Sequence, residues 1–240
     1  MTSNLKNVPI RDPQETKLAF VLLLDTSKSM EGSPIQALNE GLQKSLKEAL
    51  SGDDIVEKCV EISIITFGGK PDNPEVPEVR VVHDFCSVSD FNPTQLEANG
   101  NTPMGEAILL AIDHVENRKK IYKKENIEYH RPWIFMITDG EPTDMVEGDE
   151  RWKEVIQRVH NGEDKNKFLF RVIAVEGANT KVLSKIKHPE RKLFNLTGLN
   201  FAKLFEYVGP SVGAIPDLKE GNIKAEEEVL VQDGKGFKIN

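Results

Sequence analysis

Two aspartates and three hydroxyl side chains in this sequence could together bind a metal ion. Asp25, Ser27 and Ser29 stand at alternate positions in the stretch LLLDTSKSM, where an apolar run ends. In an extended or looped backbone this spacing can turn all three side-chain oxygens to one side. Thr102 and Asp139 come from two later segments, NTPMGEA and ITDGEPTD. Carboxylates and hydroxyls without thiol or imidazole suit a hard cation such as Mg²⁺, Mn²⁺ or Ca²⁺.

Each of these five positions also has an ordinary structural explanation. An aspartate at the end of an apolar run is typical of a turn, and serines in loops often hydrogen-bond to the backbone. Thr102 precedes Pro103, so it could simply cap the start of a helix. Taken one at a time the residues favour these structural roles, whereas their combination favours a metal site.

The segments that carry these residues alternate between strand-like and helix-like patterns. Segments of strand length, most of them rich in apolar residues, are found at 18–24, 60–67, 78–85, 133–138, 168–175 and 192–196. Apolar residues with helical spacing predict a helix that starts near Pro34, with Ser33 as its N-cap. Further helices are predicted from Pro103 onward and around 152–159, 182–186 and 201–208.

This alternation predicts the fold class. Continuous apolar strands between helices indicate a doubly wound α/β domain with a mostly parallel, six-stranded sheet and helices on both faces. The link between 60–67 and 78–85 is too short for a helical crossover, so these two strands are predicted to be antiparallel. In open sheets of this type ligands bind beyond the carboxyl ends of the strands, where Asp25 and Asp139 are placed.

The pattern divides the chain into three parts. The α/β domain is predicted to cover 14–210, after an N-terminal extension at 1–13. From Asp217 onward the periodicity is lost, and the last 24 residues carry six acids and four lysines. This composition predicts that 211–240 is a mobile or loosely docked tail.

Composition narrows the classes of partner and location. A formal net charge of −8 argues against nucleic-acid binding, which usually needs a basic face. The longest apolar run, at 18–24, is too short to span a bilayer, and no apolar signal segment opens the sequence. Cys59 and Cys86 are expected to be reduced thiols, although an antiparallel hairpin could bring them close together. We therefore expect a cytoplasmic protein without a membrane span.

Enzymatic alternatives have less support than a binding role. A phosphatase of the haloacid dehalogenase type needs a second aspartate where this chain has Ser27. The segment GPSVG resembles a nucleophile elbow, but no histidine follows Ser211. No phosphate-binding glycine motif is found. A non-enzymatic protein is predicted, and metal-assisted hydrolysis or phosphotransfer at the Asp25 site stays open as the alternative.

The complete pattern resembles that of a known family. DTSKSM, NTPMGEA and ITDGEPTD together resemble the von Willebrand factor A domain and its metal-ion-dependent adhesion site, whose motif is D-x-S-x-S…T…D. All five motif positions are filled in order, by Asp25, Ser27, Ser29, Thr102 and Asp139. The wording GNTPMGEAI and RPWIFMITDGEPTD is also similar to bacterial TerY-type proteins associated with tellurite resistance.

This resemblance implies a fold and a function. The strand order would be 3-2-1-4-5-6 with one short antiparallel edge strand. The five residues would bind Mg²⁺, or Mn²⁺ or Ca²⁺, directly or through water. The metal would keep an open position that an Asp or Glu of a protein partner fills. The TerY-type likeness implies a bacterial tellurite or stress response, with kinase-like or phosphatase-like proteins as partners.

Other charged residues lie close to the motif in the sequence. Lys28 stands where bacterial relatives often have glycine, and we expect it to point to solvent. Glu31, Glu106, Glu141 and Asp144 add negative charge around the motif. Glu106 and Asp144 could support the metal ligands, but a solvated surface position is favoured for each.

Overall fold

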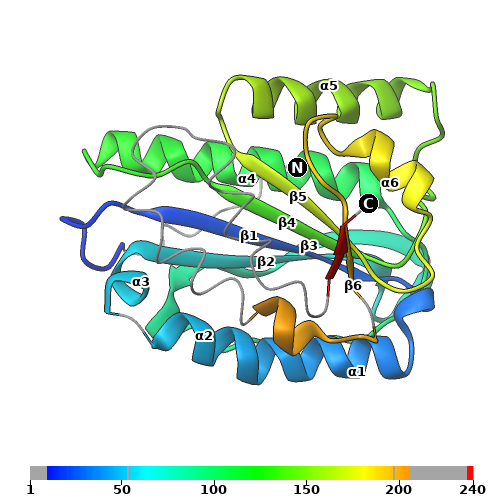
Figure 1. Ribbon diagram of the computed structural model, residues 1–240, viewed down its shortest axis with the longest axis horizontal. Helices are drawn as coiled ribbons and strands as arrows, with labels where there is room; N and C mark the ends of the chain where they lie inside the picture. Colours follow the sequence, from blue (N-terminus) through cyan, green and yellow to red (C-terminus); the bar gives the residue numbers. More distant parts are fainter. Residues whose placement is uncertain (1–9, 53, 197, 206–236, 240) are drawn as a thin grey trace.

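The computed structural model describes residues 10–52, 54–196, 198–205 and 237–239. A single sheet lies at the centre, between helices on both of its faces (Figure 1). Its strands are β1 (Leu18–Thr26), β2 (Val60–Lys70), β3 (Asn73–Ser87), β4 (Trp133–Thr138), β5 (Leu169–Ala174), β6 (Phe194–Leu196) and β7 (Phe237–Ile239). The α-helices are α1 (Ser33–Glu40), α2 (Lys47–Ser51), α3 (Asp54–Cys59), α4 (Met104–Lys124), α5 (Glu150–Asp164) and α6 (Thr180–Ile186). There are also short or irregular helical stretches at η1 (Lys28–Met30), the π-helical η2 (Gly41–Leu46) and η3 (Val88–Asp90), and residues 201–205 are helical as well.

The strand order confirms the predicted fold class. The sheet runs β3-β2-β1-β4-β5-β6-β7, and the five strands from β2 to β6 are parallel. β3 is the predicted antiparallel edge strand. β7 pairs antiparallel with β6 and adds a seventh strand that the sequence did not predict. It comes from the end of the predicted tail, and 211–236 lie outside the described residues.

Two apolar layers bury the central strand completely. All nine residues of β1 are buried. Leu18, Phe20, Leu22 and Leu24 face the layer with α1 and the helical residues 201–205, whereas Ala19, Val21 and Leu23 face α4, α5 and α6. Because both faces are covered, β1 reads as one continuous apolar run rather than an alternating one. Figure 1 shows α1 and α2 on one side of the sheet and α4 and α5 on the other.

Several element boundaries differ from the predicted ones. Gly32, with a φ of 87°, occupies the N-cap position of α1, so Ser33 lies inside the first turn rather than capping it. Pro103 occupies the N-cap position of α4, which places Thr102 outside the helix and removes the capping alternative. The last predicted helix is described only up to Phe205, and Val208 lies outside the described residues.

Neither cysteine forms a disulfide. Cys59 and Cys86 are both unoxidised and partly buried. β2 and β3 do form the antiparallel hairpin, but Cys86 lies opposite Ile62 and Cys59 precedes the strand. None of the helices in the described part of the chain combines the length and the hydrophobicity needed to cross a bilayer.

The loop between η3 and α4 is held tightly against the ends of β1 and β2. The carboxamide of Asn39 in α1 donates to Leu96 O at 2.9 Å and accepts from Leu96 N at 2.8 Å. Asn99 N donates to Thr26 O, and Gly69 N donates to Asn99 O, both at 2.8 Å. These bonds fix the path of the loop three residues before it reaches Thr102.

Replacing Asn39 by alanine should destabilise the protein by about 1–3 kcal/mol, because both main-chain groups of buried Leu96 lose their partner. Chemical denaturation of wild type and variant measures this loss of unfolding free energy. Gln43→Ala, at an exposed position one turn further along, is the matched control and should stay within about 0.5 kcal/mol of wild type. An Asn39→Ala variant as stable as the control would contradict this account of the loop.

Candidate metal centre

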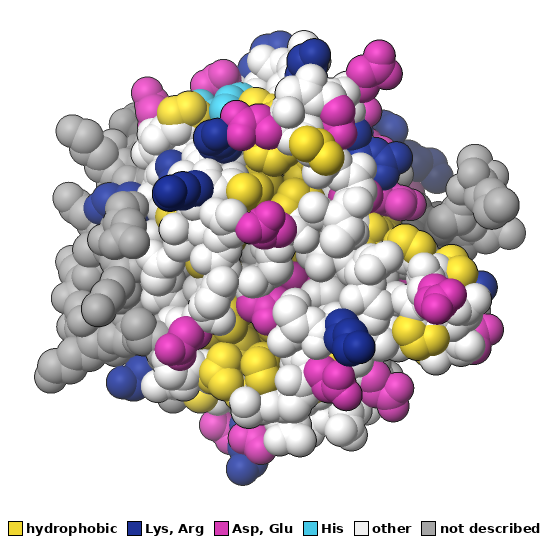
Figure 2. Space-filling view, turned by 90° about the vertical axis from the view of Figure 1, so that its right-hand side faces the viewer, with side chains coloured by type: hydrophobic (Ala, Val, Ile, Leu, Met, Phe, Trp, Pro, Cys, Tyr) yellow, Lys and Arg dark blue, Asp and Glu magenta, His cyan; other side chains and the backbone are white. Residues whose placement is uncertain are grey.

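The five predicted residues meet at the carboxyl ends of the central strands. β1 and β4 are neighbours in the sheet. Asp25 is the last residue but one of β1, and Asp139 follows β4 directly. Figure 2 faces this end of the sheet and shows acidic side chains at the centre of the face, with others around it. The topology therefore brings together residues that are more than a hundred positions apart.

A chain of hydrogen bonds joins the two aspartates through the two serines. Asp25 Oδ1 accepts a bond of 2.8 Å from the backbone N–H of Ser27. Ser27 Oγ lies 3.0 Å from Ser29 Oγ, which in turn donates to Asp139 Oδ1 at 2.7 Å. The hydroxyl of Thr138 donates to Asp25 Oδ2 at 2.5 Å. Four of the five predicted residues are thus in one connected group.

Thr102 reaches the same place from the loop before α4. A Cβ atom built on Gly140 would lie 3.2 Å from Thr102 Oγ1 and 3.3 Å from Asp25 Oδ2. These two oxygens therefore border the space that Gly140 leaves free by having no side chain. Thr143 holds the threonine there, since its hydroxyl accepts from Thr102 N at 3.0 Å and its own N–H donates to Thr102 O at 2.9 Å.

The group is closed on one side and open on the other. Asp25, Ser27 and Thr102 are buried, with 0%, 1% and 6% of their surface exposed. Ser29 is exposed and Asp139 is partly exposed. The floor of the site therefore consists of inaccessible oxygens, and its rim consists of oxygens that a molecule in solution can reach.

The electrostatics of the site favour a cation. The pKa of Asp25 is raised to about 6. Burial is the main cause and the charge of Asp139 adds to it, whereas the hydrogen bonds from Ser27 and Thr138 act in the opposite direction. Partial burial also raises the pKa of Asp139, against the hydrogen bond from Ser29. Within the described part of the chain, neither carboxylate forms an ion pair with a basic side chain.

The other fully buried carboxylates among the described residues have arginine partners. Glu61 accepts from Arg118 Nε at 2.8 Å, and Glu163 accepts from Arg131 and Arg191, both at 2.7 Å. Asp25 has hydroxyl and amide donors but no such cation. Two carboxylates with three hydroxyls fit a divalent ion, because the charges balance and all donors are oxygens.

Residues around the site confirm one expectation and correct another. Lys28 is exposed, as predicted; its backbone N–H donates to Gly100 O and its carbonyl accepts from Glu31 N. Asp144 is not a solvated rim residue, because it accepts from the backbone N–H groups of Gly105 and Glu106 at 3.0 and 2.9 Å. It also pairs with Arg151. Asp144 therefore anchors the loop after β4 to the first turn of α4.

Sequence reasoning missed the residues that support the five. Thr138 donates to Asp25 and accepts from Gly140 N at 3.1 Å, and Thr143 holds Thr102. All of these residues, and Asp144 with them, belong to the segment ITDGEPTD that supplies Asp139. The density of hydroxyl and carboxyl groups in that one segment was the available signal.

The comparison with known families agrees with this geometry. The model of the von Willebrand factor type A domain matches residues 20–206, which include all five residues of the site. The chain belongs to this family. Von Willebrand factor type A domains are metal-dependent protein-binding modules that carry a metal-ion-dependent adhesion site.

Curated proteins and solved structures with similar sequences or folds were also found. Inter-alpha-trypsin inhibitor heavy chain 4 of Mus musculus is 26% identical over 125 residues, which is 51% of this chain and 12% of the relative. The pilus adhesin SpaC of Lactobacillus rhamnosus GG superposes with a TM-score of 0.59 at 9% identity, over 82% of this chain and 30% of the adhesin. Proximal thread matrix protein 1 of the mussel byssus was solved with a zinc-occupied adhesion site. It superposes with a TM-score of 0.54 at 14% identity, over 84% of this chain and 46% of the mussel protein. At these identities the structures show a shared fold, and this chain spans only a small part of the curated relative.

Asp25→Asn should stabilise the metal-free domain at neutral pH. The folded-state pKa of about 6 lies above the ordinary value of 3.8, so the carboxyl group favours folding fully below pH 3.8. That contribution is lost as the pH rises through 6, because the folded protein must then hold a buried charge. The neutral amide avoids the charge while keeping the size and one acceptor oxygen. At pH 8 with a chelator, denaturation should give the variant about 2 kcal/mol more stability than wild type.

The difference should shrink as the pH falls toward 4, where wild-type Asp25 is protonated as well. A variant that is less stable than wild type at pH 8 in the chelator would contradict the burial of an unbalanced charge at this position.

Proposed function

We propose that this domain binds Mg²⁺ through Asp25, Ser27, Ser29, Thr102 and Asp139 and uses the bound ion to capture an acidic residue of a protein partner. The observation that carries the proposal is the connected group of two carboxylates and two serine hydroxyls with no basic partner in the described part of the chain. Membership of a family of metal-dependent binding modules supports the same reading.

The donor set favours Mg²⁺ over other ions. Mg²⁺ is usually bound by one or two carboxylates and keeps several waters, whereas Ca²⁺ takes six to eight oxygens. Asp25 and Asp139 supply two carboxylates, and the described residues contain no group of three or more His, Cys, Asp or Glu side chains arranged to hold a metal. When bound, the ion would supply the positive charge and the coordination position that attract a carboxylate from outside. Mn²⁺ is the nearest substitute, and the mussel protein with zinc in its adhesion site is a relative with a different ion.

The exposed rim supports a role in capture. Ser29 and Asp139 are the accessible members of the set, so a partner reaches the ion from their side. A carboxylate is the ligand that a hard cation with an incomplete oxygen shell prefers. We therefore infer a partner that presents an Asp or Glu on its surface.

A non-catalytic role fits the surroundings better than hydrolysis or phosphotransfer. Ser63, His114 and Asp84 lie close together, but they are not arranged as a nucleophile set. Ser63 Oγ and Asp84 Oδ1 both approach the same nitrogen, Nε2 of His114, and Ser63 is completely buried. Burial lowers the pKa of His114 to about 4. The alternative is an enzyme that uses the metal site itself.

The biological setting is proposed from the motif wording. GNTPMGEAI and RPWIFMITDGEPTD resemble bacterial TerY-type proteins, which supports a tellurite or stress response and kinase-like or phosphatase-like partners. The absence of a disulfide at Cys59 and Cys86 is compatible with the cytoplasmic location that we propose. The functional unit would be the domain at 14–210.

Mg²⁺ should raise the thermal stability of the wild-type domain, since an ion that binds only the folded state stabilises it by mass action. At a hundredfold excess over its Kd the gain would be about 2.7 kcal/mol. Ser29→Ala and Asp139→Asn should weaken the metal-dependent gain, and Ser184→Ala, on the exposed surface of α6, should leave it intact. Titration with Mg²⁺, Mn²⁺ and Ca²⁺ followed by calorimetry measures these shifts. If millimolar concentrations of all three ions leave the thermal stability of wild type unchanged, the proposal of a metal site is wrong.

Capture of a carboxylate should depend on the ion. The peptide Ac-Gly-Gly-Asp-Gly-Gly-NH₂ should shift the amide NMR signals of the loops around Ser29 and Thr102 in Mg²⁺ and leave them unchanged in EDTA. The matched peptide with Asn in place of Asp should have no effect in either condition. Turnover of p-nitrophenyl phosphate that requires Mg²⁺ and is lost in Asp139→Asn would instead identify the domain as an enzyme.

A further inference from the structure

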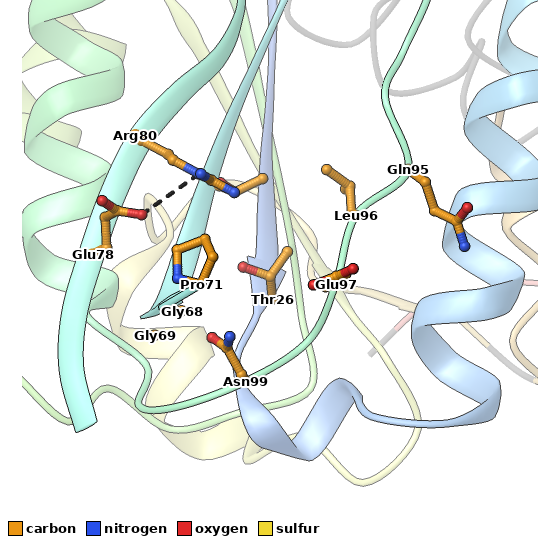
Figure 3. Close-up of a pocket in the computed structure, with 11 residues that line it drawn as sticks. Thr26, Gly68, Gly69, Pro71, Glu78, Arg80, Gln95, Leu96, Glu97 and Asn99 are labelled. Atoms are coloured by element: carbon orange, nitrogen blue, oxygen red, sulfur yellow. Dashed lines mark ion pairs between the residues drawn. The ribbon is translucent and has the colours of Figure 1, made fainter. Parts of the chain in front are cut away.

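A polar hollow of about 170 Å³ lies beside the metal centre, at the ends of β1, β2 and β3. The loop that carries Leu96, Glu97 and Asn99 forms its other wall (Figure 3). Figure 3 shows Arg80 reaching in from β3, opposite Leu96 and Glu97 on the loop. Neither the sequence motif nor the proposed metal chemistry uses this hollow.

The hollow and the metal centre share a wall. Thr26 lines the hollow and stands between Asp25 and Ser27 in the chain. Consecutive Cα atoms are about 3.8 Å apart, so this residue is in direct contact with two proposed metal ligands. Asn99, on the opposite wall, bonds to Thr26 O and precedes Thr102 by three residues. One short segment of a partner can therefore touch both places.

The side chains that line the hollow have a net charge of −1. Glu78 and Glu97 carry two negative charges, and Arg80 carries one positive charge. Arg80 Nε lies 3.6 Å from Glu78 Oε2, so these two side chains balance each other. Glu97 is exposed and has no ion-pair partner in the part of the chain that the structure describes. A ligand that brings a positive charge would complete the balance.

The hydroxyl of a mostly buried threonine points to the same kind of ligand. Thr66 lines the hollow with 4% of its surface exposed, and it lies opposite Arg80 in the ladder between β2 and β3. Its hydroxyl makes no hydrogen bond to any described residue. Thr66 Oγ1 is not among the fully buried atoms that lack a partner, so it keeps accessible surface and can accept from a donor that enters the hollow. An ammonium or guanidinium group supplies such a donor together with the missing charge.

We propose that the hollow binds the basic head group of a Lys or Arg that the partner carries a few residues from its metal-binding carboxylate. The head group would pair with Glu97 and donate to Thr66, and its aliphatic stem would lie against Leu96 and Pro71. This inference rests on the proposed function, because the same partner segment occupies both places. It defines the partner as a surface segment with an acidic and a basic residue close together.

Peptides of the form Ac-Asp-(Gly)n-Arg-NH₂, with n from one to four, test the inference on the full chain in Mg²⁺. Matched peptides carry citrulline, which has the shape of arginine without its charge. At one spacer length the arginine peptide should bind about tenfold more tightly than the citrulline peptide by calorimetry, as expected for a charge-assisted hydrogen bond. Glu97→Gln and Thr66→Val should each reduce that preference. Glu48→Gln, the same charge change on the exposed surface of α2, should preserve it.

The outcomes separate this inference from the proposed function. Equal affinity of arginine and citrulline peptides at every spacer length, with binding still dependent on Mg²⁺ and on Asp, would overturn the basic-residue site and leave the metal capture standing. An arginine preference that survives in Glu97→Gln would also overturn it. Loss of any dependence on Mg²⁺ and on Asp would overturn the proposed function itself. Agmatine, a free guanidinium compound, should bind far more weakly than the peptide; equal binding would assign the hollow to a small-molecule cation instead of a partner side chain.

Discussion

A buried carboxylate without a counter-ion is the constraint around which this structure is arranged. Asp25 is completely buried at the end of the central strand, and only neutral donors surround it in the described residues. The same protein gives Glu61 and Glu163 arginines as partners, so it has the means to balance buried charge elsewhere. Keeping an unbalanced charge in a low-dielectric place costs free energy, and a cation from outside removes that cost.

The rest of the fold brings the remaining oxygens to that carboxylate. β1 is buried on both faces, which holds Asp25 in place, and β4 next to it delivers Thr138 and Asp139. The loop before α4 would be free to move on its own, but Asn39 and the ends of β1 and β2 bind it. Gly140 completes the arrangement by leaving room between two of the oxygens. The contributors come from segments that are far apart in the sequence, and the sheet makes them neighbours.

Structural features that a single continuous segment of sequence encodes were predictable. Contacts between segments that are far apart in the sequence were harder to predict. The continuous apolar runs of β1, β2, β4 and β5 predicted the buried parallel sheet because burial on both faces demands that composition. The alternate spacing of Asp25, Ser27 and Ser29 predicted the candidate metal site because three oxygens within one short stretch can face the same side. By contrast, the contacts of Thr138 and Asp144 join side chains to partners dozens of residues away, and nothing in the local pattern specifies them. β7 was missed because a three-residue strand is stabilised by the edge it pairs with rather than by its own sequence.

The main-chain bonds from Asn99 to Thr26 and from Gly69 to Asn99 connect the hollow to the proposed metal site. Only Gly100 and Asn101 separate Asn99, which lines the hollow, from Thr102, and Gly100 O accepts a bond of 3.0 Å from Lys28 N. An occupant of the hollow that displaces Asn99 would therefore also displace the short stretch of chain that leads to Thr102. Thermodynamic reciprocity then requires the two occupants to change each other's affinity by the same factor. If both proposed occupants bind, the wall would couple them, and the domain would respond to an acidic and a basic residue together more strongly than to either one alone.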